Sequence, residues 1–252
     1  MGLFSKKKDD SSSSGATIAP PTGGISIEAK ARFTAIKGKA GFAAGMKGLS
    51  GQKARVAAVL DISGSMQSLY QSGIVQKIVE RMLALGVTFD DNGAVDMFLF
   101  SNGSKRRYIG ELTEANFEGA VDRIIKAHDD LWGATDYAPV MEMVVKKYTS
   151  EPGDPGYVAF FTDGDNYDKP KTKQVIIDAA KHPIFWQFVG IGSARKNFLE
   201  MLDTMEGRVI DNANFFDAGM GIEGMDDGEL FDKMLVEFPD WLSKAKTQGI
   251  IA

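Results

Sequence analysis

The sequence contains no cysteine, only two histidines and no long hydrophobic run. The absence of cysteine among 252 residues excludes disulfides, thiolate zinc sites and cysteine nucleophiles. His128 and His182 are too few for a histidine metal site or an obvious catalytic triad. No apolar stretch reaches about 18 residues, the length that favours a membrane span. Any chemistry must therefore rest mainly on oxygen side chains.

The chain also lacks an overall excess of positive charge. It has 29 Lys and Arg against 34 Asp and Glu, a net charge of -5. Nucleic-acid phosphates call for a basic face, so this balance disfavours a nucleic-acid partner. The start of the chain does not follow the order of a secretory signal, and Lys6 stands where a myristoylation pattern needs Ser or Thr. We therefore expect a cytoplasmic protein with no membrane span and no nucleic-acid partner.

Composition and periodicity divide the chain into three parts. Residues 1–26 are rich in Ser, Pro, Gly and Lys and predict a disordered arm, because they cannot bury enough apolar surface to offset ordering. Residues 27–52 carry a helical apolar stripe interrupted by glycines, so a marginal helix and a loop both remain open. Residues 53–252 alternate apolar runs with helical periodicity and predict one α/β domain.

This domain pattern predicts an open, mostly parallel sheet. The run at 56–60 is continuously apolar, which is typical of a strand buried on both faces. The expected strands are 56–60, 94–100, 105–109, 157–162, 184–191 and 209–216. The expected helices are 74–85, 113–127, 137–148, 171–181, 197–205 and a single closing helix over 228–246. The predicted fold is α/β: a doubly wound, mostly parallel six-stranded sheet of Rossmann-like type, with one antiparallel edge strand and helices on both faces.

The antiparallel strand follows from a turn signal. Asn102-Gly103 is a strong hairpin dipeptide, so residues 105–109 should return beside the strand before them. The three adjacent cations Lys105, Arg106 and Arg107 are interpreted as protection of an exposed sheet edge. A nucleic-acid role for this triplet is the weaker alternative.

Hydroxyl and carboxylate side chains gather where strands are expected to end. Asp61, Ser63 and Ser65 follow one strand at two-residue spacing, so they can converge on one point. Asp163 ends another strand, and a third loop offers Thr135. The carboxyl ends of parallel strands meet at one edge of a sheet. A hard site of low charge suits Mg²⁺ better than Zn²⁺, with Mn²⁺ or Ca²⁺ as alternatives.

This constellation resembles the metal-ion-dependent adhesion site (MIDAS) of von Willebrand factor type A (VWA) domains. Asp61-Ile62-Ser63-Gly64-Ser65, Thr135 and Asp163 match its five positions, although Gly133-Ala134 stands where paired glycines would be expected. From about Lys53 to Ile251 the chain is similar to the cytoplasmic VWA proteins of bacterial tellurium-resistance and stress-response systems. The stretches that carry this similarity are Ala134-Thr135-Asp136-Tyr137-Ala138-Pro139-Val140, Phe161-Thr162-Asp163-Gly164-Asp165-Asn166, Pro183-Ile184-Phe185-Trp186-Gln187-Phe188-Val189-Gly190-Ile191-Gly192 and Glu237-Phe238-Pro239-Asp240-Trp241-Leu242.

The resemblance implies a role for each matched residue. Ser63 and Ser65 would bind the metal directly, and Thr135 would do so in the ligand-competent state. Asp61 and Asp163 would act largely through bound water. A Glu or Asp of a partner protein would complete the coordination. By the residues alone, Asp136 is expected as a helix N-cap, and Asp165 and Asp168 as turn and cap residues.

Three functions remain open at this stage. The leading one is a binding module, not an enzyme, that recognises an acidic partner residue through Mg²⁺ in a bacterial stress or tellurium-resistance complex. The alternative is a metal-dependent hydrolase or phosphoryl-transfer enzyme with Asp61 as nucleophile. In a phosphatase loop the position two residues on usually carries a second Asp as general acid, and here it is Ser63. The third is a structural domain with an idle site.

Overall fold

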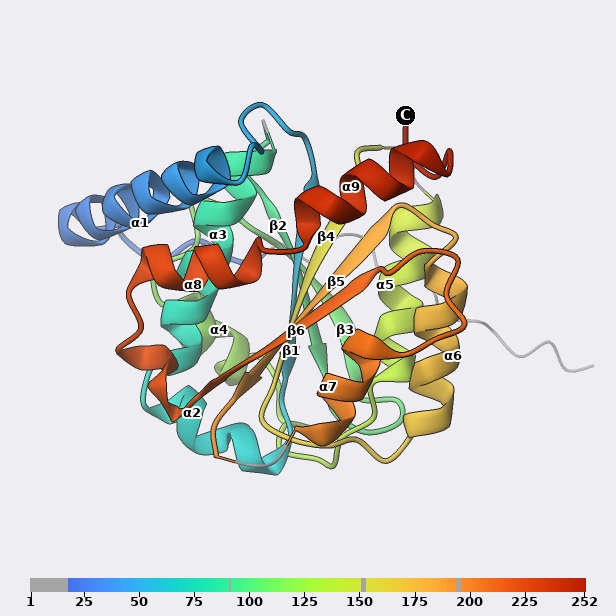
Figure 1. Ribbon diagram of the computed structural model, residues 1–252. Helices are drawn as coiled ribbons and strands as arrows, with labels where there is room; N and C mark the ends of the chain where they lie inside the picture. The colour runs from blue at the N-terminus through green and yellow to red at the C-terminus, as the bar shows by residue number, and fades with distance from the viewer. Residues whose placement is uncertain (1–17, 91, 151–152, 194–195) are drawn as a thin grey trace, which may run out of the picture.

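A six-stranded sheet forms the centre of the protein (Figure 1). The computed structural model describes residues 18–90, 92–150, 153–193 and 196–252. The strand order is β3-β2-β1-β4-β5-β6; β3 runs antiparallel to β2, and the other neighbours are parallel. The strands are β1 (Arg55–Asp61), β2 (Val95–Phe100), β3 (Arg106–Leu112), β4 (Gly156–Thr162), β5 (Ile184–Ile191) and β6 (Ala213–Gly219). The predicted fold class, including the antiparallel edge strand, is confirmed.

Helices cover both faces of this sheet. The apolar cluster on one face draws on α1 (Ile27–Met46), α3 (Ile74–Phe89), α4 (Ala120–Lys126), α8 (Asp227–Met234) and α9 (Phe238–Thr247). The cluster on the other face draws on α5 (Ala138–Ser150), α6 (Lys169–Ala179) and α7 (Asn197–Thr204). Short turns of helix, η1 (Gly64–Met66), α2 (Gln67–Gln71) and η2 (Met220–Glu223), follow strand ends. Across the described ranges, every helix is too short or too polar to span a membrane.

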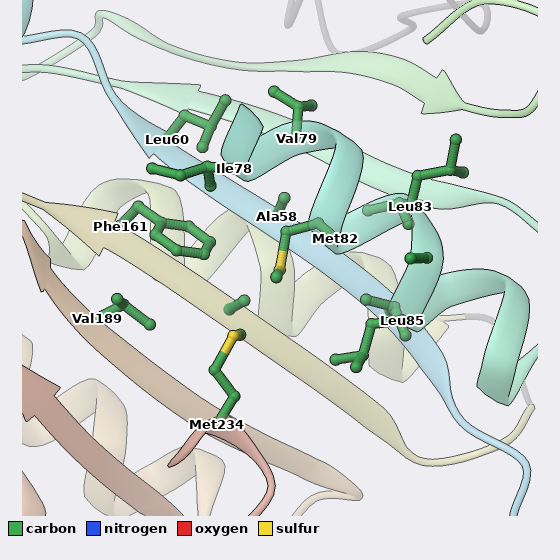
Figure 2. Close-up of a cluster of buried hydrophobic side chains, with 14 of the residues drawn as sticks. Ala58, Leu60, Ile78, Val79, Met82, Leu83, Leu85, Phe161, Val189 and Met234 are labelled. Atoms are coloured by element: carbon green, nitrogen blue, oxygen red, sulfur yellow. The ribbon is translucent and has the colours of Figure 1, made fainter. Parts of the chain in front are cut away.

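The central strands are buried on both faces, which explains their continuous apolar runs. Every residue of β4 and β5 is buried. On one face, Leu60 of β1, Phe161 of β4 and Val189 of β5 belong to the same apolar cluster as side chains of α3 and Met234 of α8, as Figure 2 shows. Full burial of one such side chain stabilises the fold by about 1.5–3 kcal/mol. This packing holds β1 and β4, whose ends carry the candidate site, in a fixed register.

The segment 27–52 contains a long helix, α1, that packs on the domain. Ser26 caps α1 by accepting a hydrogen bond from the Ala29 amide, and its own N–H and hydroxyl both donate to Glu118 at 2.7 Å. Arg32 donates to both carboxylate oxygens of Glu80, at 2.9 and 3.0 Å. The inner face of the helix is buried at Ala29, Phe33, Ile36, Ala40, Ala43 and Ala44. Of the two open alternatives the helix is therefore the observed one, because tertiary contacts outweigh the glycines.

The predicted arm is only partly described. Ile18 is buried in the core cluster, and its carbonyl accepts a hydrogen bond from Asn116 Nδ2 at 2.9 Å. Residues 18–26 therefore contact the domain before α1 begins. Residues 1–17 lie outside the described residues, so the disordered arm at 1–26 stays a prediction there.

Two expected helices have different bounds. The single closing helix over 228–246 is wrong, because α8 ends at Met234 and α9 starts anew at Phe238 with Pro239 in its first turn. Proline has no backbone N–H and favours a helix start over a helix interior. The helix expected over 113–127 begins only at Ala120, after Gly119 with a φ of 63°. The turn before it is held by Asn116 Oδ1, which accepts the Thr113 amide at 2.7 Å.

The last strand also begins later than expected. Its pairing starts with Ala213 opposite Trp186, whereas the sequence placed the strand over 209–216. The Arg208 guanidinium instead fixes a loop here, because it pairs with Asp211 at 2.7 Å and donates to the Met205 carbonyl at 3.0 Å.

Replacing Phe33 by Ala should destabilise the protein by about 3–5 kcal/mol, since its buried ring would leave a cavity beside Phe117, 5.0 Å away between ring centres. Phe42→Ala is the matched control on the same helix, because that ring is 72% exposed and its loss should cost about 0.5 kcal/mol or less. Urea unfolding of both variants measures the difference. Equal stabilities would mean that α1 does not contribute to the folded core.

Acidic side chains near the start of α9 give the stability a pH dependence. Burial, together with the nearby charges of Asp203 and Asp211, raises the pKa of Glu237 to about 7. Because this folded-state pKa lies above the ordinary value of 4.5, stability falls as pH rises from 4.5 to about 7 and stays lowered above that.

Glu237→Gln should therefore be as stable as the parent protein near pH 4.5 and more stable above pH 7. Since Glu237 is only partly buried, solvent screening limits the gain to about 1 kcal/mol. Denaturant unfolding at several pH values between 4.5 and 8 measures it. A stability difference that does not change with pH would show that the Glu237 carboxyl titrates normally.

Candidate metal centre

The five predicted site residues lie at the carboxyl edge of the sheet, where the chain order reverses between β1 and β4. Asp61 is the last residue of β1, and Asp163 directly follows β4. Ser63, Ser65, Thr135 and Asp163 line one hollow of about 350 Å³. Such switch points are where open α/β sheets hold ligands. The fold thus brings these residues together; their role as metal ligands stays a prediction.

A chain of hydrogen bonds links the hydroxyls to the carboxylates. The hydroxyls of Ser63 and Ser65 lie 3.2 Å apart. Ser65 Oγ donates to Asp163 Oδ1 at 2.9 Å, and the Ser63 amide donates to Asp61 Oδ1 at 2.7 Å. Four site residues are therefore joined by direct contacts, and a cation would compete for the same oxygens.

Asp61 lies beneath the hollow and does not line it. Its exposed fraction is 0%, and its second oxygen accepts a 2.7 Å bond from the Thr162 hydroxyl. Burial raises the pKa of Asp61 to about 7, although the hydrogen bonds from Thr162 and Ser63 oppose the shift. Burial also raises the pKa of Asp163, against the hydrogen bond from Ser65. A divalent ion would lower both values, because its charge stabilises the ionised carboxylates.

The loop that carries Thr135 is fixed by backbone pairing to the loop after β1. The Trp132 amide donates to the Ile62 carbonyl, and the Gly64 amide to the Gly133 carbonyl, both at 2.9 Å. A Cβ at Gly133 would collide with Ser101 Oγ and Asn102 Oδ1, so a larger residue there would displace these side chains. Trp132 adopts a φ of 67°, an unfavourable backbone conformation for a bulky residue that often marks functional loops.

Two residues of this site were not singled out from the sequence. Thr162 bonds to Asp61 Oδ2, and the Tyr137 hydroxyl lies 3.1 Å from Thr162 Oγ1 and also donates to the Gly164 carbonyl. The position of Thr162 in the sequence could have indicated its role, because it ends a strand that lies directly beside the strand ended by Asp61. Tyr137 has no comparable signal, because only the tertiary fold places its hydroxyl under the site.

The neighbouring acidic residues Asp136 and Asp168 accept hydrogen bonds from backbone amides, and the role of Asp136 differs from the prediction. Asp136 is not the N-cap of α5, because its Oδ2 accepts the Gly103 amide at 2.8 Å. The first amides of that helix region, at Tyr137 and Ala138, instead donate to the two oxygens of Asp168, each at 2.9 Å. The prediction for Asp136 is wrong because the capping carboxylate belongs to Asp168, in the loop after β4. Asp168 is too far from α5 in the sequence for local patterns to reveal this contact.

The donor set is poor in negative charge. In the part of the chain that the structure describes, no three His, Cys, Asp or Glu side chains come together as a possible metal site. The hollow offers hydroxyls and Asp163, with Asp61 behind them. Oxygen donors with few carboxylates fit a hard ion such as Mg²⁺, which retains several waters.

Comparisons with known proteins identify relatives of the chain by sequence. Residues 53–251 match the family vWA-TerF-like, described as the vWA found in the TerF C terminus. The uncharacterized protein YcbR of Bacillus subtilis (strain 168) is 46% identical over 209 residues, which are 81% of this chain and 84% of that protein.

Solved structures are more distant. A von Willebrand factor type A structure from Catenulispora acidiphila is 13% identical, with a TM-score of 0.48, covering 75% of this chain and 42% of that one. Proximal thread matrix protein 1 from the mussel byssus, solved with a zinc occupied MIDAS motif, is 16% identical with a TM-score of 0.46, covering 76% and 48%. The chain thus spans less than half of either protein. The family match and the YcbR relative establish that this chain belongs to the TerF-like family of von Willebrand factor type A domains.

Proposed function

We propose that this chain is a protein-binding module that holds Mg²⁺ at the carboxyl edge of its sheet and recognises an acidic residue of a partner protein. The observation that supports it best is the single hollow lined by Ser63, Ser65, Thr135 and Asp163. One open side of this hollow faces solvent, because Ser65 is exposed. A carboxylate from another protein can therefore reach an ion held there.

The hydroxyl and carboxylate residues of this chain would have different roles in binding the ion. The hydroxyls of Ser63, Ser65 and Thr135 would hold the ion directly, and Asp61 and Asp163 would orient its waters. Bound Mg²⁺ supplies a concentrated positive charge for an incoming carboxylate. Because neutral hydroxyls leave much of that charge unbalanced, the site favours an anionic ligand from outside.

The cellular setting of this function is a proposal from family alone. The match to the vWA of TerF favours a role in a bacterial tellurium-resistance or stress-response complex in the cytoplasm. YcbR is itself uncharacterized and adds no specific partner.

The enzymatic alternative has less support from the geometry. A nucleophile must contact its substrate, whereas Asp61 has no exposed surface and both of its oxygens already accept hydrogen bonds. Turnover of a phosphate ester that Asp61→Asn abolishes would favour the enzyme. An idle site is favoured instead if no metal binds.

Isothermal titration with Mg²⁺ and Mn²⁺ should show one weak site in the parent protein and none in Ser63→Ala/Ser65→Ala, since two direct ligands are lost. Ser243→Ala, on the exposed face of α9, is the control and should bind as the parent does. Circular dichroism should report the same fold for all three. Undiminished binding by the double variant would refute the ligand assignment.

Thr135→Ala should abolish metal-dependent capture of partners from a host lysate while changing the unfolding free energy by about 1 kcal/mol or less, because no hydrogen bond of its hydroxyl to the described residues contributes to the fold. Thr149→Ala is a matched control on the outer face of α5, where the hydroxyl bonds only within its helix. Quantitative pull-downs with Mg²⁺ and with EDTA measure both. Recovery of the same partners by Thr135→Ala, or in EDTA, would mean that binding uses another surface.

A further inference from the structure

We propose that the partner segment carries more than the one metal-bound acid: a second acidic residue that contacts Lys105 and Arg106, and an apolar side chain that contacts Tyr167. This inference rests on the proposed function and specifies its ligand. It follows from Tyr167, which lines the hollow, and from two cations in a turn that is hydrogen-bonded to the Thr135 loop.

The turn between β2 and β3 is built onto the metal loop. Ser101 Oγ donates to the Ala134 carbonyl at 2.6 Å, and the Asp136 amide donates to the Ser101 carbonyl at 3.2 Å. Asp136 in turn accepts the Gly103 amide. The turn is therefore hydrogen-bonded to the loop that carries Thr135, and its two cations lie at the same edge of the sheet as the hollow.

Lys105 and Arg106 differ from the other cations of this edge. Arg107 pairs with Asp130, Lys169 with Asp165 at 2.6 Å, and Lys196 with Asp217 at 3.1 Å. Among the described residues, neither Lys105 nor Arg106 has a carboxylate within 4 Å, and the Arg106 guanidinium donates only to the Gly103 carbonyl, at 3.0 Å. Two partly exposed positive charges beside a site for a carboxylate favour a ligand with additional acids.

Protection of the sheet edge explains Lys105 less well than it explains the two arginines. A cation that protects an edge strand lies along that strand, as Arg106 does opposite Phe100 and Arg107 does opposite Leu99. Lys105 precedes β3 and belongs to the turn, and Arg106 is its first residue. Both therefore lie at the carboxyl end of the sheet, on the side of the metal loops.

The strand order sets the spacing that a ligand must have. The turn lies between β2 and β3, one to two strands from β1 and its metal loop. Neighbouring strands lie about 4.8 Å apart, and an extended chain advances about 3.3 Å per residue. The second acid therefore lies about two or three residues from the metal-bound acid.

Tyr167 provides the apolar contact on the β4 side. The residue is 81% exposed although it lines the same hollow, and its amide donates to the Thr135 carbonyl at 3.0 Å. A rigidly anchored, exposed tyrosine beside a charged site is typical of residues that dominate interface energies. An apolar residue next to the metal-bound acid would cover this ring.

The test uses fluorescein-labelled ten-residue peptides and the full chain, with binding read by fluorescence anisotropy. The first peptide has one central Glu in a Gly-Ser background. The second adds Glu two and three positions to each side, and the third adds Phe next to the central Glu. We expect Lys105→Gln/Arg106→Gln to bind the second peptide about fivefold more weakly and the first unchanged, with a smaller dependence on salt. Tyr167→Ala should remove the gain given by Phe.

Lys244→Gln/Lys246→Gln is the control, since it removes the same charge from α9, at the opposite end of the sheet from α2 (Figure 1). Equal weakening by this control, or no weakening by the Lys105/Arg106 variant, overturns the second-acid contact. An unchanged gain from Phe in Tyr167→Ala overturns the apolar contact. Tighter binding of a single-stranded oligonucleotide than of the second peptide overturns an acidic protein segment as the ligand.

Removal of the metal separates this inference from the proposed function. If EDTA leaves peptide binding intact while Lys105→Gln/Arg106→Gln weakens it, the cationic turn is supported and the metal-dependent function fails. If EDTA abolishes binding while that variant has no effect, the function stands and the cationic turn is overturned. Absence of binding by every peptide in Mg²⁺ overturns both.

Discussion

The hydrogen bond between Thr162 Oγ1 and Asp61 Oδ2 is the contact on which the candidate site depends. A buried carboxylate without partners would cost several kcal/mol, yet Asp61 has no exposed surface. The parallel register removes this difficulty, since Leu60 faces Phe161 and the next residues along the two strands are Asp61 and Thr162. The Ser63 amide satisfies the other oxygen, so one carboxylate fixes both the strand ends and the turn that presents the hydroxyls.

Backbone pairing then extends this order to the second loop. Ser63 forms a parallel bridge with Gly133, and the Ser101 hydroxyl binds the carbonyl of Ala134. Space is limited at Gly133, whereas the side chain of Ala134 is exposed. The second glycine of the expected pair can therefore be replaced by alanine. If these loops hold a metal as proposed, their backbones need little rearrangement, because hydrogen bonds already fix the two loops beside each other.

The sequence predicted the features that local chemistry determines. Continuous apolar runs gave the buried strands, Asn102-Gly103 gave the antiparallel edge, and the two-residue spacing of Asp61, Ser63 and Ser65 gave the turn. It failed where distant residues decide the outcome. Asp168 caps α5 from another loop, and α1 is stabilised by Glu80 and Glu118, which local propensity cannot reveal. Tyr137 was missed for the same reason, because its hydroxyl reaches the site only in the folded protein.

The proposed recognition of an acidic partner by a protein of negative net charge raises a question of charge at this edge. Screening limits the reach of surface charges to about 8 Å in physiological salt, so the net charge of -5 matters less than the groups beside the contact. At this edge Asp165 is neutralised by Lys169, and Asp136 is held by the turn amide of Gly103. An ion bound in the hollow as proposed would add positive charge at the same edge of the sheet as Lys105 and Arg106. This local positive charge would favour an acidic segment even though the net charge of the chain is negative.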